Sequence, residues 1–226
     1  MARRVLGQNG SAMLTELGKC TRLVFVSNID TWAIFVNMPS MSDSKTDILD
    51  AAMRVFTRYG LKKTTMKDIA EEAGVARQTV YNAFSNKDVL LCDLIRHAGI
   101  QIEEQTRAEW AKGGTLTAKL NVFFEIALVQ PYLIMTASPE VETLEESLSA
   151  AGHQAMSEVD EIKQALLLEL FADHAEVLAG HDLSVEQMAE WVRITCVGYK
   201  FQAKSEAQLR QLLSVVAHMV ELLCAK

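Results

Sequence analysis

Apolar residues recur at three- and four-residue intervals along most of the chain from residue 44 onward, the spacing of an amphipathic helix. In the first such stretch, the capping pattern Ser44-x-x-Asp47 precedes the apolar face and Gly60 ends it. The apolar face consists of Ile48, Ala52, Val55, Phe56 and Tyr59. The sequence therefore predicts a first helix between Ser44 and Gly60.

Two shorter helices are predicted between Thr65 and Phe84. Thr65 is placed to cap the first of them, and Asp68, three residues later, can accept a hydrogen bond from the Thr65 backbone in turn. Gly74 ends this helix in a left-handed conformation that suits glycine. The second helix is predicted from Ala76 to Asn82. Its exposed positions are polar and capable of hydrogen bonding: Arg77, Gln78, Thr79, Tyr81 and Asn82. This is the pattern of a helix-turn-helix whose second helix enters a DNA major groove.

The rest of the chain also reads as helices. Residues 85–88 form another capping sequence and open a long helix, predicted to run to Ala111 before Gly113 and Gly114 break it. Five further helices are predicted. The first covers 115–129, with Pro131 ending or kinking it, and the second starts at Pro139 with the acidic run 140–146 at its N-terminal end. The other three cover 154–179, 184–203 and 205–223. No stretch alternates with period two for long enough to predict a strand. The predicted fold class is all-α.

Residues 1–41 do not share this periodicity. The apolar stretch 23–38 is short and contains Asn28 and Asp30, so it does not predict a membrane-spanning helix. Met41 resembles a second beginning. We expect residues 1–41 to be an extension that is poorly ordered or translated from a start assigned too far upstream.

Charge is divided unevenly along the chain. The whole chain carries a net charge of −7, which argues against a protein that coats nucleic acid by bulk electrostatics. Residues 41–90 hold 8 Lys and Arg against 7 Asp and Glu, whereas residues 91–226 hold 10 against 20. A near-neutral module that can approach phosphate is thus followed by an acidic body, which favours two domains with different partners.

The sequence offers little to support catalysis. It contains no nucleophile elbow, no glycine loop of the kind that cradles phosphate, and no metal-ligand cluster. His174 and His181, each beside an aspartate (Asp173 and Asp182), come closest to a metal site, but solvated residues at a helix–loop junction explain them better. We predict no enzyme, no metal and no cofactor. The four cysteines lie far apart without a C-x-x-C pair, which favours a reduced, cytoplasmic setting.

The last two predicted helices carry broad apolar faces. Their apolar positions are Met188, Trp191, Val192, Thr195, Cys196 and Tyr199 on one, and Leu209, Leu212, Leu213, Val216, Met219, Val220 and Leu223 on the other. Such faces can form a four-helix interface across a two-fold axis, or they can close the core of a single subunit. Dimerisation is favoured because one short helix reads few base pairs, whereas two spaced a DNA turn apart read a palindrome.

One set of residues matches a known family. They are Ile48-Leu49-Asp50-Ala51-Ala52, Phe56, Tyr59-Gly60, Thr64-Thr65, Ile69-Ala70, Ala73-Gly74-Val75, Tyr81, Phe84, Lys87 and Leu90. On these, residues 44–95 resemble the DNA-binding domain of the tetracycline-repressor (TetR/AcrR) family of bacterial regulators. The resemblance implies a DNA-binding domain at 42–102, with its helix-turn-helix at 65–84. It also implies a helical ligand-binding and dimerisation domain at 103–226, where only the architecture is similar.

The resemblance also implies roles for individual residues. Arg77 and Gln78 lie where the family reads bases, and arginine suits guanine while glutamine suits adenine. Thr65 and Lys87 resemble phosphate contacts, and Tyr81 resembles a tyrosine that reaches the DNA backbone. Thr79 could contact a phosphate or a thymine methyl, and Asn82 is a weaker candidate for a base contact. For each of these residues, solvent-exposed helix polarity is the alternative.

The expected function is a transcriptional regulator, a repressor, that binds a palindromic double-stranded DNA operator as a homodimer. A small apolar or aromatic effector would release it by moving the long helix 85–111 and so changing the spacing of the two recognition helices. Candidate effector contacts are Trp110, Phe123, Phe124, Tyr132, Met135, Met156, Trp191 and Tyr199, although such stripes more often form core. An anionic effector would instead meet Arg107, Arg193 or His97. The alternative function is a DNA-binding protein that is constitutive or controlled by a protein partner.

Overall fold

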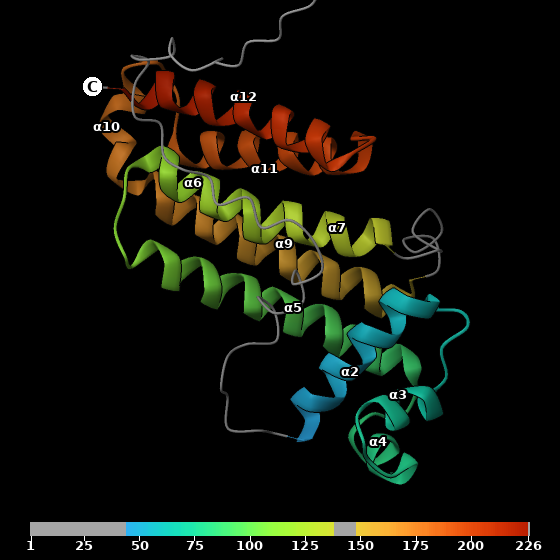
Figure 1. Ribbon diagram of the computed structural model, residues 1–226. Coiled ribbons are helices and arrows are strands. Elements are labelled where there is room, and N and C mark those ends of the chain that lie inside the picture. The colour runs from blue at the N-terminus through green and yellow to red at the C-terminus, as the bar shows by residue number, and fades with distance from the viewer. Residues whose placement is uncertain (1–43, 138–147, 226) are drawn as a thin grey trace, which may run out of the picture.

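The computed structural model describes residues 44–137 and 148–225, and these residues form helices and connecting turns with no strand among them (Figure 1). The predicted extension 1–41 and the helix predicted from Pro139 along the acidic run lie outside the described residues. The helices are α2 (Ser44–Tyr59), α3 (Met66–Glu72), α4 (Arg77–Ala83), α5 (Lys87–Trp110), α6 (Leu116–Phe124), a π-helix (Glu125–Val129), α7 (Gln130–Ala137), α9 (Ala150–Phe171), a 3₁₀-helix (Ala172–His174), α10 (Ala175–Ala179), α11 (Val185–Gln202) and α12 (Glu206–Cys224). The predicted all-α class is confirmed.

Helices α2, α3 and α4 pack as a small module around the first turns of α5 (Figure 1). Its buried core is made of Ile48, Leu49, Ala52, Phe56, Met66, Ile69, Ala70, Val80, Phe84, Leu90, Leu91 and Leu94. A module of this size buries too little surface to be secure alone, and here α5 supplies the missing apolar side chains. Tyr59, which we expected on the buried face of the first helix, is half exposed instead.

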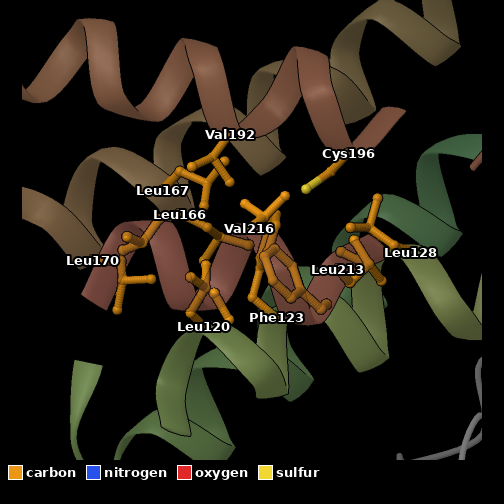
Figure 2. Close-up of a cluster of buried hydrophobic side chains, with 14 of the residues drawn as sticks. Leu120, Phe123, Leu128, Leu166, Leu167, Leu170, Val192, Cys196, Leu213 and Val216 are labelled. Atoms are coloured by element: carbon orange, nitrogen blue, oxygen red, sulfur yellow. The ribbon is translucent and has the colours of Figure 1, made fainter. Parts of the chain in front are cut away.

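The remaining helices form a larger bundle with its own core. Side chains from α6, α9, α11 and α12 converge there, and Figure 2 shows Leu120 and Phe123 meeting Leu166, Val192 and Val216. Helix α5 belongs to both units, because its first half lines the small core while Ile102 and Trp110 belong to the larger one. Ile95 packs against both cores. The two-part organisation expected from the sequence is therefore present, with one helix shared between the parts.

Pro131 does not end its helix, although the backbone departs from the α-helix just before it. We predicted that the helix beginning near Thr115 would end or kink there, but it continues to Ala137 through five residues of π-helix, Glu125–Val129. A proline ring crowds the carbonyl four residues earlier, here that of Ala127, and the wider π turn around Ala127 relieves that crowding.

Within the described parts of the chain, Leu116–Ala137 is the one stretch long and apolar enough to cross a membrane, with a mean hydropathy of 1.4. Half of its most apolar window is buried, and Leu120, Phe123 and Phe124 belong to the larger core. We therefore assign it as the core helix of the bundle.

Local capping signals set most helix starts. Asn86, Thr115, Ser184 and Ser205 each accept a backbone N–H with the side chain and so begin a helix where the sequence indicates one. The helix predicted at 154–179 is different. It begins at Ala150, capped by Ser149, and is interrupted by the 3₁₀ turn at 172–174.

The apolar faces of the last two helices need correction. Most of the residues we expected on a dimer face, including Met188, Val192, Leu213 and Val216, are buried in the core of the single subunit. Two of the expected residues, Trp191 and Met219, remain on the surface of α11 and α12, together with Ile194, Phe201, Val215 and Leu222, which were not expected there. The pattern predicted two amphipathic helices correctly, and their inner faces close the core of the subunit, which is the alternative that the sequence left open.

Candidate nucleic-acid interface

Helix α3 begins with a complete capping box. The N–H of Asp68 donates to Thr65 Oγ1 at 3.3 Å, and the N–H of Thr65 donates to Asp68 Oδ2 at 2.8 Å. The Thr65 hydroxyl also donates to Asp68 Oδ2 at 2.9 Å. These two donors hold the pKa of the Asp68 carboxyl below its usual value. The N–H and hydroxyl that we expected to meet phosphate thus both face Asp68 in this structure.

A glycine turn joins α3 to α4. Gly74 has a φ of +67°, a left-handed conformation that side chains make costly, and the N–H of Val75 donates back to the carbonyl of Ala70 at 3.0 Å. The turn brings α4 to the protruding end of the module (Figure 1). The helix-turn-helix predicted at 65–84 is present.

Helix α4 is anchored by one side chain and leaves its polar ones outward. Val80 is fully buried among the small core, and Phe84, just past the end of the helix, is fully buried too. The polar residues Arg77, Gln78, Tyr81 and Asn82 are exposed, whereas Thr79 is half buried. The exposed set therefore matches the expectation except at Thr79.

The exposed side chains of α4 bond to one another in two pairs four residues apart. Arg77 Nη2 donates to the Tyr81 hydroxyl at 3.2 Å, and the guanidinium lies 5.2 Å from the centre of the Tyr81 ring. Gln78 Nε2 donates to Asn82 Oδ1 at 2.8 Å. We did not foresee these pairs, although their i, i+4 spacing in the sequence is the signal that indicates them.

Lys87 begins α5 and reaches back to the turn between α2 and α3. Its Nζ donates to the carbonyl of Leu61 at 2.9 Å and to that of Thr64 at 3.1 Å. An ammonium group has three donors, so two of them hold the module together here and a third remains. The same turn carries Lys62 and Lys63, both exposed, which sequence reasoning did not single out.

The eight expected effector contacts do not form one group. Trp110, Phe123, Phe124 and Tyr132 are buried together in the larger core, while Trp191 is 40% exposed and does not join them. Met135, Met156 and Tyr199 are half buried. Two of the buried rings use their polar atoms on backbone carbonyls: Trp110 Nε1 donates to Lys119 at 2.8 Å, and the Tyr132 hydroxyl donates to Ala203 at 3.2 Å.

Three buried polar side-chain atoms among the described residues have no partner: Thr106 Oγ1, Gln130 Oε1 and His174 Nδ1. Sequence reasoning missed Thr106 and Gln130, since nothing in the local pattern marks a polar side chain as buried, and it considered His174 only as a solvated residue or a metal ligand. The groups proposed for an anionic effector are already engaged. Arg107 pairs with Glu103 and Glu169, Arg193 donates to Gln164, and His97 lies 3.8 Å from Asp50.

No group of three or more His, Cys, Asp or Glu side chains in residues 44–137 and 148–225 is arranged to hold a metal ion. His181 and Asp182 are exposed at the turn before α11. Cys92, Cys196 and Cys224 are buried free thiols, and burial raises the pKa of Cys196 to about 12.

Comparison with known proteins gives a sequence match for the N-terminal part of the chain and a likeness of fold for both parts. Residues 48–94 match the family model for bacterial regulatory proteins of the tetR family. The transcriptional regulator TtgR of Pseudomonas putida is 42% identical over 53 residues, which are 24% of this chain and 25% of that protein. The transcriptional repressor KstR2 of Rhodococcus jostii is 34% identical over 55 residues, 24% of this chain and 27% of that protein. The match thus spans about a quarter of the length of these curated relatives.

Solved structures extend the likeness over both units, at the level of the fold. The regulatory protein TetR from Rhodobacter sphaeroides has a TM-score of 0.61 at 18% identity, over 78% of this chain and 98% of that one. The fatty acid degradation regulator FadR from Bacillus halodurans has a TM-score of 0.57 at 20% identity, over 79% and 96%. Residues 48–94 are thus similar to bacterial regulatory proteins of the tetR family, and the described parts of the chain share the all-helical fold of these solved structures.

Proposed function

We propose that this protein is a DNA-binding transcriptional regulator that represses its target genes and uses α4 as its recognition helix. The observation that carries the proposal is the surface of α4, where Val80 anchors the helix and four polar side chains remain exposed. Such a helix at the protruding end of a small module suits the DNA major groove. The curated relatives include proteins named as transcriptional repressors, which supports repression over activation.

Two residues of α4 are proposed to choose the sequence. Arg77 suits the O6 and N7 acceptors of guanine, and Gln78 suits the N6 and N7 atoms of adenine. Asn82 is proposed as a weaker base contact, and Thr79 as a contact to a phosphate or a thymine methyl.

Three residues are proposed to hold the DNA backbone. The Tyr81 hydroxyl, the remaining donor of Lys87 and the start of α3 at Thr65 would meet phosphates. The exposed Lys62 and Lys63 in the neighbouring turn add positive charge to the same side of Lys87. The domain limits that follow are 42–102 for DNA binding and 103–226 for effector binding and dimerisation.

We propose that the protein binds its operator as a homodimer through α11 and α12. The outward residues Trp191, Ile194 and Phe201 recur at helical spacing on α11, and Val215, Met219 and Leu222 do so on α12. A second copy of the chain would cover these stripes. Two recognition helices then read two halves of a palindrome, which gives more specificity than one helix can.

A small apolar or aromatic effector is proposed to bind among the helices of the larger unit. The four buried aromatic residues support an apolar ligand, and the unpartnered Thr106 and Gln130 atoms offer it hydrogen bonds. Binding would shift α5, which reaches from Trp110 in the larger core to Lys87 in the small module. The free thiols of the three described cysteines support a cytoplasmic location.

Selection of bound DNA from a random pool tests the proposal, followed by a screen of small apolar and aromatic molecules for release of the winning sequence. We expect enrichment of a palindrome by the wild type and loss of that enrichment in Arg77→Ala. Failure of the wild type to enrich any palindrome would overturn the proposal. Enrichment without release by any molecule favours the second candidate, a regulator that is constitutive or controlled by a protein partner.

A further inference from the structure

The amide of Gln78 is held in one orientation by its neighbour one turn along α4. Gln78 Nε2 donates to Asn82 Oδ1 at 2.8 Å, and both side chains are exposed. A carboxamide has two donor hydrogens on nitrogen and an acceptor oxygen. One Gln78 hydrogen is used on Asn82, so Gln78 presents one N–H and its Oε1 side by side to any ligand of this helix.

That donor–acceptor pair is complementary to adenine. The major-groove edge of adenine carries the N7 acceptor beside the N6 amino donor, so the free N–H and Oε1 of Gln78 match both. Guanine presents N7 and O6, which are both acceptors, and O6 would face Gln78 Oε1 without a hydrogen between them. In the observed orientation, Gln78 therefore favours adenine over guanine.

Turning both amides over together would reverse this preference. Asn82 Nδ2 would then donate to Gln78 Oε1, and Gln78 would turn its NH₂ group, with two N–H donors, toward the ligand, which suits the two acceptors of guanine. In that arrangement, the Asn82 Oδ1 atom, which is an acceptor, would face away from Gln78 and toward the surroundings. DNA surrounds a bound recognition helix with phosphate oxygens, which require donors. The observed arrangement leaves the Asn82 NH₂ group for them, so DNA favours the adenine-reading orientation.

We propose that Asn82 is a positioning residue that fixes the amide of Gln78, so that α4 reads adenine and rejects guanine at the base pair facing Gln78. This inference rests on the proposed function, since it concerns how the recognition helix selects its operator. It replaces the weaker role of Asn82 as a base contact of its own. The hydrogen-bonding chemistry of residue 82 then decides which base Gln78 prefers. An acceptor at position 82 keeps the preference for adenine, whereas a donor reverses the orientation of the Gln78 amide.

Four variants separate this role from a merely structural one. Gln78→Ala identifies the operator position concerned, as the position whose base preference it removes. Asn82→Ala should lower the adenine-over-guanine preference at that position by about tenfold, because either amide orientation becomes available. Asn82→Asp, which can only accept, should keep the preference while binding DNA more weakly overall. Asn82→Lys, which can only donate, should shift the preference toward guanine.

The measurement is selection of bound DNA from a random pool by each purified full-length variant, with the folded fraction checked by thermal unfolding. Asn121→Ala, an exposed asparagine on α6, is the matched control and should leave the preference unchanged. The double variant Gln78→Ala/Asn82→Lys should show no shift to guanine at this position. A shift that persists would mean that the lysine reads the base itself and would overturn the proposal.

The outcomes also distinguish this inference from the proposed function. A wild type that enriches no palindrome defeats both. A wild type that enriches one, with Gln78→Ala changing no position or a position that is not adenine, defeats only the role of Gln78 and Asn82. Retention of adenine in both Asn82→Ala and Asn82→Lys, or its loss in Asn82→Asp, would likewise overturn the positioning role alone.

Discussion

Gly99 of α5 lies so close to Val159 of α9 that a Cβ at position 99 would stand 2.7 Å from Val159 Cγ2. The two helices run side by side in the same direction (Figure 1), and ion pairs flank the contact, Arg96 with Glu158 at 2.7 Å and Arg107 with Glu169. Only glycine allows this approach. The pair α5–α9 is therefore expected to move as one body when an effector shifts α5.

Gly99→Ala should destabilise the protein even though alanine favours a helix over glycine by about 1 kcal/mol. The new methyl group meets the branched Val159 side chain, which is stiff at Cβ, and overpacking of this kind costs roughly 1–3 kcal/mol. Urea unfolding measures the difference. Adding Val159→Ala to Gly99→Ala should recover part of the loss due to the clash. An increase in stability in Gly99→Ala alone would show that α9 yields easily.

Arg77→Ala and Lys87→Ala should weaken DNA binding in different ways. Arg77→Ala should lose ~1–3 kcal/mol of discrimination between the operator and a scrambled sequence, as expected of a bidentate base contact. Lys87→Ala should weaken binding to both alike and reduce the dependence of binding on salt. Titrations of both DNAs at several salt concentrations measure this. If Lys87→Ala changed specificity while Arg77→Ala did not, the assigned roles would be wrong.

Lys87→Ala should also lower the stability of the free protein. It leaves the carbonyls of Leu61 and Thr64 without the ammonium that joins them to α5. Loss of a partner for such groups costs about 1–3 kcal/mol when water cannot replace it, and Lys87 is half buried. Chemical unfolding without DNA measures this, with Lys63→Ala in the same turn as the exposed control. Equal stability in the two variants would mean that water replaces the lysine.

Ile194→Glu and Val215→Glu should weaken a homodimer. Both residues are more than half exposed in the subunit, at 55% and 53%, and lie on the outward stripes of α11 and α12. Burying an unpaired carboxylate in an apolar contact costs several kcal/mol, so the dissociation constant of the homodimer should rise by about a hundredfold. Sedimentation equilibrium measures it. Ser214→Glu, exposed on α12 and about 100° around the helix from Val215, introduces the same charge off the stripe and should leave the dimer intact. An unchanged dimer in both stripe variants would place the interface elsewhere.

Asp68 should make the start of α3 sensitive to acid. Hydrogen bonds from the N–H and hydroxyl of Thr65 lower its pKa in the folded state below the reference value of 3.8. The stabilisation by Asp68 is therefore fully present at pH values above its pKa in the unfolded chain. It is lost as the pH falls through its lower pKa in the folded protein. Melting temperatures of the wild type and Asp68→Asn should differ near neutral pH and converge under acid. A difference that stayed constant down to acidic pH would contradict this.

Cys196 should resist alkylation in the native protein. Burial raises the pKa of its thiol to about 12, so the reactive thiolate is scarce near neutral pH and the sulfur is also enclosed by the larger core (Figure 2). Iodoacetamide labelling followed by mass spectrometry of the peptide that contains Cys196 should find modification only after denaturation. Rapid labelling of the folded protein would reveal an opening of the bundle at α11.

The sequence by itself determined the features that depend on neighbours along the chain. The cap at Thr65 and Asp68, the turn at Gly74 and the helix starts at Ser184 and Ser205 are short-range hydrogen-bond patterns, so they could be predicted from the residues alone. The periodicity of apolar residues likewise predicted the all-α class. The pairing of Gln78 with Asn82 also lay within reach, because its spacing is local.

Tertiary structure decided which surface of each helix is used and what distant residues meet. Periodicity marks an apolar face but not its partner, so Val216 was expected in a dimer and lies in the subunit core, while Ile194 was not expected on an apolar face and is exposed. Neither the bonds of Lys87 to the turn at Leu61 nor the approach of Gly99 to Val159 leaves a local signal. These contacts join residues 23 positions apart or more, and only the packing of the helices determines them.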